Sequence, residues 1–131
     1  GLPVFASLSF AKNRKGELRT LFGNTPAESA RRLLESGAAA VGANCGLVED
    51  CIEAVREMKR AVSAPMVLYP NAGAPVLREG KTHFEQSAAD LASFLDAEID
   101  AGATILGGCC GTTPEYIRLI SRKVRGKKRH A

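Results

Sequence analysis

The sequence has no long hydrophobic run and no recognisable targeting segment. No apolar stretch approaches the roughly 20 residues that a membrane-spanning helix needs. Residues 1–10 lack the basic start of a secretory signal peptide, and Lys12, Arg14 and Lys15 follow them. Tryptophan is absent, but 45% of the residues are hydrophobic and 24% are charged, which is typical of a soluble globular protein. We therefore expect a single cytoplasmic domain of 131 residues with no membrane partner.

The sequence also lacks the dispersed positive charge of a nucleic-acid-binding protein. Its formal net charge is +4, but six basic residues are concentrated near the C-terminus. Without these six charges the net charge would be −2, so the rest of the chain is close to neutral. We expect no nucleic-acid partner and a frayed, solvated end that contains Arg122, Lys123, Arg125, Lys127, Lys128 and Arg129.

Cysteine is scarce, with four residues in the chain. Four cysteines could form two disulfides in a small secreted protein. The absence of a secretory signal makes metal binding or catalysis the better explanation. The sequence contains no Cys-x-x-Cys motif of a redox pair and no Gly-x-x-x-x-Gly-Lys motif of a phosphate-binding loop.

Two glycine-rich loops carry three of the cysteines. Cys45 lies in segment 42–46 (GANCG), and Cys109 and Cys110 lie in segment 107–111 (GGCCG). Each loop follows a short apolar run that predicts a strand, and neighbouring residues of a regular strand point to opposite faces. Adjacent thiols can converge only where the strand kinks or ends, which glycine permits. Three converging thiolates would suit a tetrahedral zinc ion with one open position, as in catalytic zinc sites.

Strand and helix patterns alternate four times along the chain. One helix start is especially clear, because Thr25 and Glu28 form a capping-box pattern with Pro26 at the first helical position. Segments 37–46 and 102–111 align as an internal repeat with an offset of 65 residues, which corresponds to two strand–helix units of about 32 residues. The expected strands are 3–10, 38–43, 65–69 and 103–107, and the expected helices are 25–36, 50–62, 87–101 and 113–125.

This alternation predicts an α/β fold built on a parallel sheet. A complete (β/α)8 barrel has eight such units and about 250 residues. Four strand–helix units therefore correspond to half of a (β/α)8 TIM barrel. Half a barrel leaves two strand edges and an inner apolar face uncovered, so we expect either a piece of a larger enzyme or self-association.

The candidate chemistry gathers at one end of the predicted sheet. Cys45, Asn71, Cys109 and Cys110 all follow the carboxyl ends of predicted strands, where βα folds carry their active sites. Loop 73–86 at the same end is long for a βα connection, and loops of that length are often functional. The arrangement predicts a single site at this end.

Three motifs, GANCG, YPNAG (69–73) and GGCCGTTPE (107–115), resemble the homocysteine S-methyltransferase family in sequence and order. The most similar members are the homocysteine-binding modules of cobalamin-dependent methionine synthases. The resemblance covers residues 3–126 and implies that residues 1–131 are the C-terminal half of a homocysteine-binding barrel. In that case the missing N-terminal half would supply the opposite wall of the pocket.

The resemblance implies zinc-dependent methyl transfer to homocysteine, which gives methionine. Cys45, Cys109 and Cys110 would hold the zinc, and the homocysteine sulfur would take the open position. Asn71 would face the metal and is a candidate for the open position when substrate is absent, and Asn44 would orient the neighbouring ligand loop.

The methyl donor is not encoded in this chain. Relatives use methylcobalamin fed by methyltetrahydrofolate, betaine or S-methylmethionine. Cobalamin and methyltetrahydrofolate would act in a full-length parent through other modules. The chain alone is expected to be an inactive fragment.

Several assignments have alternatives. Asn71 could serve only to stabilise its turn, Cys51 is predicted to pack inside the fold, and His83 is predicted to be exposed. The chain could instead be a non-catalytic zinc-binding or assembly half-barrel. It could also be a thiol redox protein that uses Cys109 and Cys110, although a disulfide between adjacent cysteines is strained.

Overall fold

The computed structural model describes residues 1–128. Residues 129–131, including Arg129 of the basic end, lie outside the described part of the chain. None of the helices in residues 1–128 is long and apolar enough to cross a membrane.

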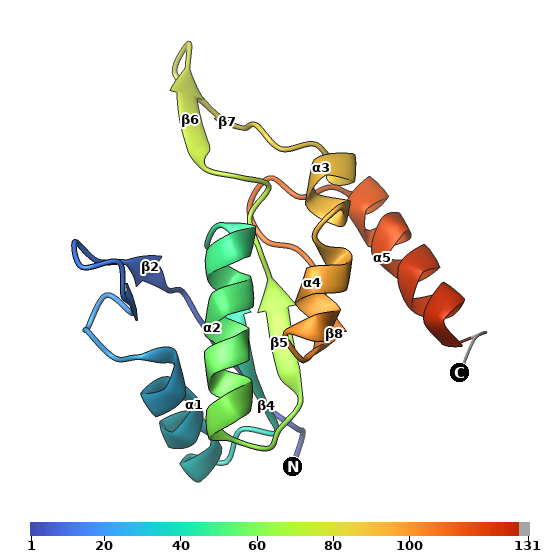
Figure 1. The fold of residues 1–131 in the computed structure, drawn as a ribbon. Helices are drawn as coiled ribbons and strands as arrows, with labels where there is room; N and C mark the ends of the chain where they lie inside the picture. The colour runs from blue at the N-terminus through green and yellow to red at the C-terminus, as the bar shows by residue number, and fades with distance from the viewer. Residues whose placement is uncertain (129–131) are drawn as a thin grey trace.

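A four-stranded parallel sheet forms the centre of the molecule (Figure 1). Its strands are β1 (Phe5–Leu8), β4 (Ala40–Asn44), β5 (Met66–Tyr69) and β8 (Ala103–Leu106), in the order β1-β4-β5-β8. Val41 pairs with Met66 and Asn44 with Tyr69, so the carboxyl ends of β4 and β5 are level. This arrangement confirms the predicted α/β fold with four parallel strand–helix units, as in half of a (β/α)8 barrel.

Two helices cover one face of the sheet. Helix α1 (Pro26–Glu35) begins with the predicted capping box, in which the Thr25 hydroxyl accepts from the Glu28 amide and the Glu28 carboxylate accepts from the Thr25 amide. Helix α2 (Val48–Ala61) begins two residues earlier than predicted and has no side-chain cap. Both helices contact β4, and α2 also contacts β5.

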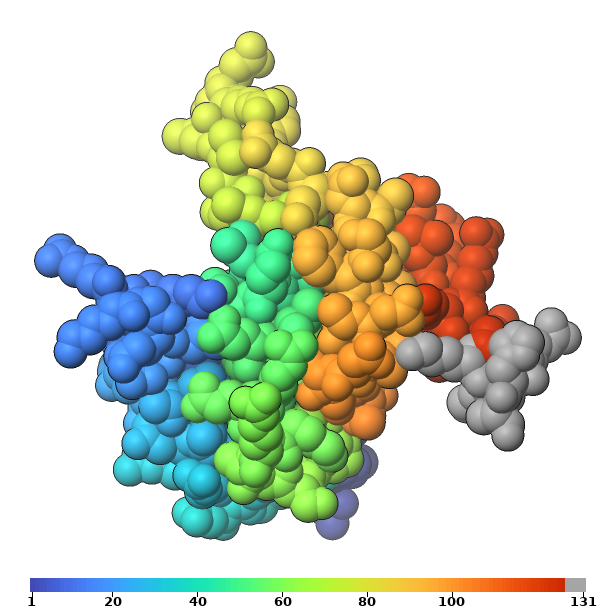
Figure 2. All heavy atoms as spheres, in the orientation of Figure 1, coloured from blue at the N-terminus to red at the C-terminus, as the bar shows by residue number. Residues whose placement is uncertain are grey.

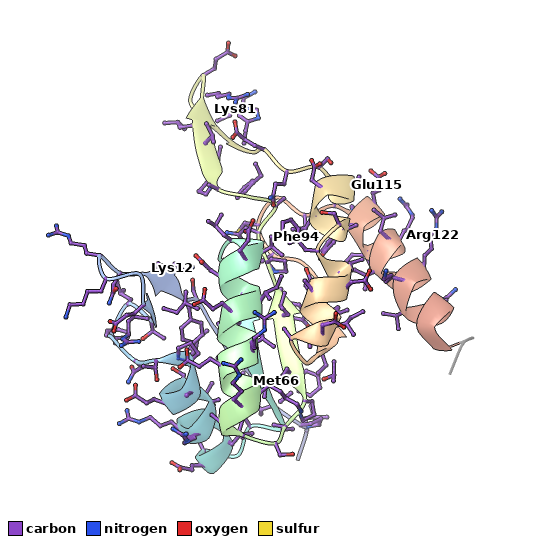
Figure 3. All side chains as sticks on the ribbon, viewed as in Figure 1. Lys12, Met66, Lys81, Phe94, Glu115 and Arg122 are labelled. Atoms are coloured by element: carbon purple, nitrogen blue, oxygen red, sulfur yellow. The ribbon has the colours of Figure 1, made fainter. Side chains whose placement is uncertain are left out.

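The predicted single helix over residues 87–101 is wrong, because the structure breaks it into α3 (Ala88–Ala92) and α4 (Leu95–Asp100). Ser87 caps α3 as expected. The break follows from Ser93, whose hydroxyl donates to the Asp90 carbonyl at 2.6 Å and competes with the helical hydrogen-bond pattern. Phe94 follows the break and packs against the core (Figure 3).

Two antiparallel hairpins were not predicted. Strands β2 (Ala11–Lys12) and β3 (Leu18–Arg19) follow β1, so only residues 5–8 of the expected first strand belong to the parallel sheet. Strands β6 (Pro75–Arg78) and β7 (Lys81–Phe84) lie inside the long loop after β5. The turn between β6 and β7 places Glu79 and Gly80 at positive φ, 50° and 74°, as a two-residue hairpin turn requires.

The hairpin of β6 and β7 projects from the body of the molecule at the end where the parallel strands finish (Figures 1 and 2). Its tip is solvent-exposed, and the Lys81 side chain points away from the body (Figure 3). The Leu77 side chain is 74% exposed. The hairpin therefore adds no hydrophobic core of its own.

The last helix, α5 (Pro114–Lys128), runs further than the predicted end at Arg125 and contacts α3. Its ordered turns include Arg122 and Lys123, so this part of the basic segment is helical and not frayed. Lys123 also forms an ion pair with Asp96 of α4.

A buried carboxyl group lies where α4 meets α5. Glu98 is fully buried, and the Tyr116 hydroxyl donates to its Oε1 at 3.2 Å. Its Oε2 has no hydrogen-bond partner among the described residues. Burial raises the pKa of Glu98 to about 7, although the hydrogen bond from Tyr116 acts in the opposite direction.

Both edges of the parallel sheet are open within residues 1–128. No described strand pairs with the outer edge of β1 or of β8. Next to the β1 edge, large hydrophobic side chains are exposed: Leu2 by 93%, Val4 by 59% and Phe5 by 56%. Such a surface is costly in water and favours a covering partner.

Candidate metal centre

Three cysteine thiols meet at the carboxyl end of the parallel sheet. The Cys45 and Cys109 sulfurs are 3.2 Å apart, the Cys45 and Cys110 sulfurs 3.6 Å, and the Cys109 and Cys110 sulfurs 3.9 Å. All three are free thiols, and among the described residues they form the only group of three or more His, Cys, Asp or Glu side chains whose ligand atoms lie within 4.8 Å of one another. Cys45 is separated from Cys109 by 64 positions and from Cys110 by 65, and the parallel strands bring their two loops together.

The end of β4 turns the Cys45 side chain toward the other loop. Cys45 has φ of 59°, in the left-handed region that non-glycine residues rarely adopt. Its amide donates to the Tyr69 carbonyl at 3.1 Å, and its carbonyl accepts from the Ser9 hydroxyl at 3.4 Å. Contacts from both neighbouring strands therefore hold this strained turn in place.

The loop after β8 folds over itself and presents both of its cysteines. The Thr112 hydroxyl donates to the Cys109 carbonyl at 2.8 Å and closes the loop. A Cβ atom at Gly108 would lie 2.4 Å from that same hydroxyl oxygen, so the closed loop leaves no space for a side chain there. The glycine permits the kink by which two adjacent thiols reach one point.

The YPNAG segment links the two cysteine loops. The Cys109 amide donates to the Pro70 carbonyl at 2.8 Å, and the Cys110 amide donates to the Asn71 side-chain oxygen at 3.1 Å. The Ala72 amide donates to the Cys110 carbonyl at 2.9 Å, and the Asn71 amide donates to the Gly46 carbonyl at the same distance. These bonds fix the loops relative to one another.

The thiols differ in their tendency to ionise. Burial raises the pKa of Cys109, but hydrogen bonds from Cys45, Cys110 and the Asn44 side chain outweigh that effect and lower the pKa below its ordinary value. Hydrogen bonds to Cys109 and Cys110 raise the pKa of Cys45 to about 12. Cys109 therefore ionises more readily than Cys45.

The sulfur positions fit a tetrahedral metal ion. Two sulfurs bound to zinc at about 2.3 Å are about 3.8 Å apart in a tetrahedral shell. The three observed separations of 3.2, 3.6 and 3.9 Å need only small shifts to reach that value. Three protein ligands leave a fourth position for water or substrate, and the exposure of Cys110 keeps the site accessible.

The structure brings five of the predicted site residues together: Cys45, Cys109, Cys110, Asn44 and Asn71. The Asn71 oxygen is engaged by the Cys110 amide and so supports a ligand loop. Cys51 is buried in the core, as predicted, and burial is the main cause that raises its pKa to about 12. His83 is exposed on β7, also as predicted, and is not part of the thiol cluster.

Sequence reasoning missed three residues that touch this centre: Ser9, Thr112 and Phe84. Thr112 carried a local signal, since a threonine three residues after Cys109 can close a turn by bonding its carbonyl. Ser9 and Phe84 reach the site from distant segments, and no local pattern indicates such contacts.

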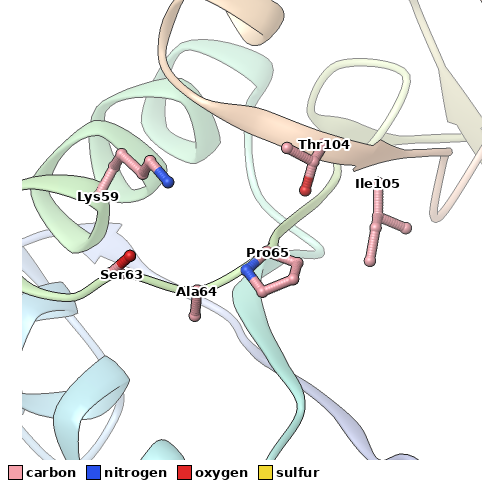
Figure 4. A pocket seen from close by; sticks show the side chains of 6 residues that line it. All are labelled: Lys59, Ser63, Ala64, Pro65, Thr104 and Ile105. Atoms are coloured by element: carbon pink, nitrogen blue, oxygen red, sulfur yellow. The ribbon is translucent and has the colours of Figure 1, made fainter.

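A cavity of about 570 Å³ lies at the opposite end of the sheet, where β5 and β8 begin (Figure 4). Lys59, Ser63 and Thr104 supply its polar side chains, and the Thr104 hydroxyl already accepts from the Met66 amide at 3.1 Å. Parallel βα folds place catalysis at the other end of the strands. The cavity therefore contributes nothing to the thiol site.

Comparison with known proteins agrees with this geometry. The family model described as homocysteine S-methyltransferase matches residues 1–124. Homocysteine S-methyltransferase 2 of Arabidopsis thaliana is 34% identical over 92 residues, covering 68% of this chain and 28% of the relative. Methionine synthase of Mycobacterium tuberculosis is 31% identical over 130 residues, covering 98% of this chain and 11% of the relative.

Solved structures show the same likeness. The metallated form of the homocysteine methyltransferase MmuM from Escherichia coli matches with a TM-score of 0.60 and 27% identity, covering 77% of this chain and 30% of that one. The oxidized form of MmuM matches with a TM-score of 0.61 and 28% identity, covering 79% of this chain and 32% of that one. The chain spans about a third or less of the length of these relatives. On sequence, fold and the match over residues 1–124, the chain belongs to the homocysteine S-methyltransferase family.

Proposed function

We propose that residues 1–131 form the C-terminal half of a homocysteine-binding barrel in a zinc-dependent homocysteine S-methyltransferase. The observation that carries the proposal is the convergence of three thiols, 3.2–3.9 Å apart, at the catalytic end of a parallel sheet. The names of the relatives support homocysteine as substrate and, through methionine synthase, methionine as product.

Cys45, Cys109 and Cys110 would hold the zinc in this proposal. When bound, the ion would lower the pKa of a coordinated substrate thiol, while the thiolate ligands keep that sulfur electron-rich and nucleophilic. The name of the metallated MmuM structure supports metal binding in a relative of this chain. In a longer parent, cobalamin and methyltetrahydrofolate would act through modules outside these residues.

The other residues of the site would position the ligands. The Asn44 side chain bonds to Cys109 and favours its ionised form. Asn71 holds the Cys110 amide. Asn71 would also be the candidate for the open position when substrate is absent.

The open β1 and β8 edges and the exposed Phe5 side chain support a covering partner. We propose that this partner is the N-terminal half of the barrel or, in its absence, a second copy of the chain. Three reduced thiols as ligands also fit a reducing compartment, which supports a cytoplasmic location.

Zinc stoichiometry and X-ray absorption test the metal assignment directly. The reduced chain should bind about one zinc ion with a sulfur-dominated shell at about 2.3 Å. Addition of homocysteine should add a further sulfur to that shell. A shell dominated by nitrogen or oxygen would rule out the three-cysteine site.

A second candidate function is thiol redox chemistry. The structure favours Cys45 and Cys109 for it, since their sulfurs are 3.2 Å apart while Cys109 and Cys110 are separated by 3.9 Å. The name of the oxidized MmuM structure makes oxidation of a relative relevant. Mild oxidation followed by peptide mapping, with and without bound zinc, would separate the two functions, because zinc should protect the thiols if metal binding is their role.

A further inference from the structure

The base of the projecting hairpin of β6 and β7 packs against the loop that carries Cys110. Phe84 is the last residue of β7 and pairs with Pro75, the first residue of β6. Unlike the exposed tip at Leu77, the Phe84 side chain is partly buried against the body. The place where it packs is the turn that follows Cys110.

The Phe84 ring occupies the space beside Gly111. A Cβ atom built on Gly111 would lie 2.3 Å from Cγ, 2.5 Å from Cβ and 2.6 Å from Cδ2 of Phe84. Gly111 also has φ of 76°, a conformation that glycine adopts readily and that other residues rarely adopt. The ring is therefore the feature that restricts this glycine turn.

Backbone hydrogen bonds connect the same hairpin base to Cys110. The Gln86 amide donates to the Ala72 carbonyl at 3.1 Å, and the Ala72 amide donates to the Cys110 carbonyl at 2.9 Å. The hairpin base thus reaches Cys110 by two routes, through the Phe84 ring on Gly111 and through Ala72. Cys110 is the exposed member of the thiol cluster, so it has the least packing of its own.

We propose that Phe84 is a positioning residue for the metal centre. Its ring fixes the Gly111 turn and, through that turn, holds the Cys110 sulfur 3.6 Å from Cys45 and 3.9 Å from Cys109. This role rests on the proposed function, because it concerns the three thiols as metal ligands. Residues that orient ligands in this way commonly change metal affinity by about 10- to 100-fold when removed.

A cavity of about 310 Å³ borders the Phe84 ring, Gly111 and Tyr116. Truncation of Phe84 would enlarge this existing space at the surface, and it would not open a sealed core. The metal-free fold should therefore survive the substitution, while the glycine turn gains freedom. This separates a positioning effect from general loss of structure.

The test compares Phe84→Ala with Leu77→Ala, a matched loss of a hydrophobic side chain at the exposed hairpin tip. Zinc affinity is measured by chelator competition, and the cobalt-substituted protein is examined by its d–d and sulfur-to-cobalt charge-transfer bands. Phe84→Ala should weaken zinc binding about tenfold or more and alter the cobalt spectrum. Leu77→Ala should change neither, and Phe84→Leu should recover part of the affinity.

Gly111→Ala provides an independent variant, because its methyl group would collide with the Phe84 ring. It should also weaken zinc binding, because the Gly111 turn has φ of 76°, which strains alanine, and because the Phe84 Cβ lies 2.5 Å from the added methyl group. Phe84→Ala keeps that Cβ atom, so the double variant should bind zinc no better than Gly111→Ala alone. Circular dichroism of the metal-free variants shows whether each is folded; if Phe84→Ala is not, Phe84→Leu decides the question. Folded variants with wild-type affinity and cobalt spectra would overturn the role of Phe84, whereas wild-type protein that binds no zinc would overturn the proposed function itself.

Discussion

The side-chain oxygen of Asn71 accepts a hydrogen bond from the Cys110 amide at 3.1 Å, across 39 residues of sequence. The bond joins the loop after β5 to the loop after β8, and the Asn71 amide also donates to Gly46 beside Cys45. One asparagine therefore connects both cysteine loops.

Replacing Asn71 by Ala should loosen the Cys110 loop. Loss of the acceptor should lower the free energy of unfolding by about 1 kcal/mol and weaken zinc binding. Asn71→Asp keeps an oxygen that can accept from the Cys110 amide, so it should retain more of the metal-free stability. Urea unfolding and chelator competition measure the two effects, and equal stability of the Ala variant and the wild type would show that the bond is dispensable.

The three-cysteine assignment predicts a sharp contrast between the exposed thiol of Cys110, which belongs to the cluster, and the buried thiol of Cys51, which does not. Cys110→Ser should weaken zinc binding by more than about 100-fold, because it removes a ligand rather than a supporting group. Cys51→Ala should leave zinc affinity unchanged, since Cys51 lies in the hydrophobic core and outside the thiol cluster. Isothermal titration with zinc, under reducing conditions, would contradict the assignment if both variants bound equally well.

Much of this site could be predicted from the sequence, because its determinants are local. Glycine on both sides of Cys109 and Cys110 marks a distorted strand end, and parallel strands bring their carboxyl ends to one rim. The contact of Phe84 with Gly111 has no such local signal, since it depends on a hairpin that folds back from the long loop.

For two features of the fold, the break between α3 and α4 and the burial of Glu98, the sequence contained conflicting signals. The break between α3 and α4 depends on the Ser93 hydroxyl bonding back to Asp90, which competes with an otherwise helical pattern. The buried Glu98 shares helical spacing with Leu91 and Leu95, so its position on the inner face was visible in the sequence. Its charge argued against burial, and tertiary packing decided the outcome.

Glu98 should make stability depend on pH. Its pKa is raised to about 7 in the folded state from 4.5, so the folded protein holds a proton that the unfolded chain releases. The contribution of Glu98 to the free energy of unfolding should therefore be greatest below pH 4.5. It should fall by up to about 3 kcal/mol as the pH rises toward 7. Above that range its contribution should stay constant.

Glu98→Gln isolates this effect, because the amide oxygen can still accept from the Tyr116 hydroxyl but does not titrate. The variant should be more stable than the wild type at pH 8 and similar to it near pH 4. Urea unfolding across this range measures the difference between the two proteins, which cancels the titration of other groups. If the free energies of unfolding of the two proteins changed with pH in the same way, the pKa of Glu98 would not be raised in the folded state.

The open β1 edge predicts self-association of the isolated chain. Exposed Val4 and Phe5 beside an unpaired strand should favour a dimer or larger species at micromolar concentration. Phe5→Lys should reduce association, and Leu77→Lys on the projecting hairpin should not. Analytical ultracentrifugation distinguishes these cases, and a cooperatively folded wild-type monomer would contradict the prediction.

Turnover should be weak even if zinc binds as proposed. All three thiols lie in this chain, but the chain spans about a third or less of its relatives, and in our proposal the opposite wall of the pocket belongs to the N-terminal half of the barrel. Methyl transfer requires the substrate sulfur to be aligned with the donor, and a misplacement of about 1 Å can cost about 100-fold in rate. Homocysteine should therefore bind weakly and only with zinc present, with little methionine formed from methylcobalamin, betaine or S-methylmethionine offered separately.

Addition of the N-terminal half as a separate polypeptide should raise the rate, and Cys109→Ala should abolish that gain. Robust turnover by residues 1–131 alone would show that these residues already form a complete active site.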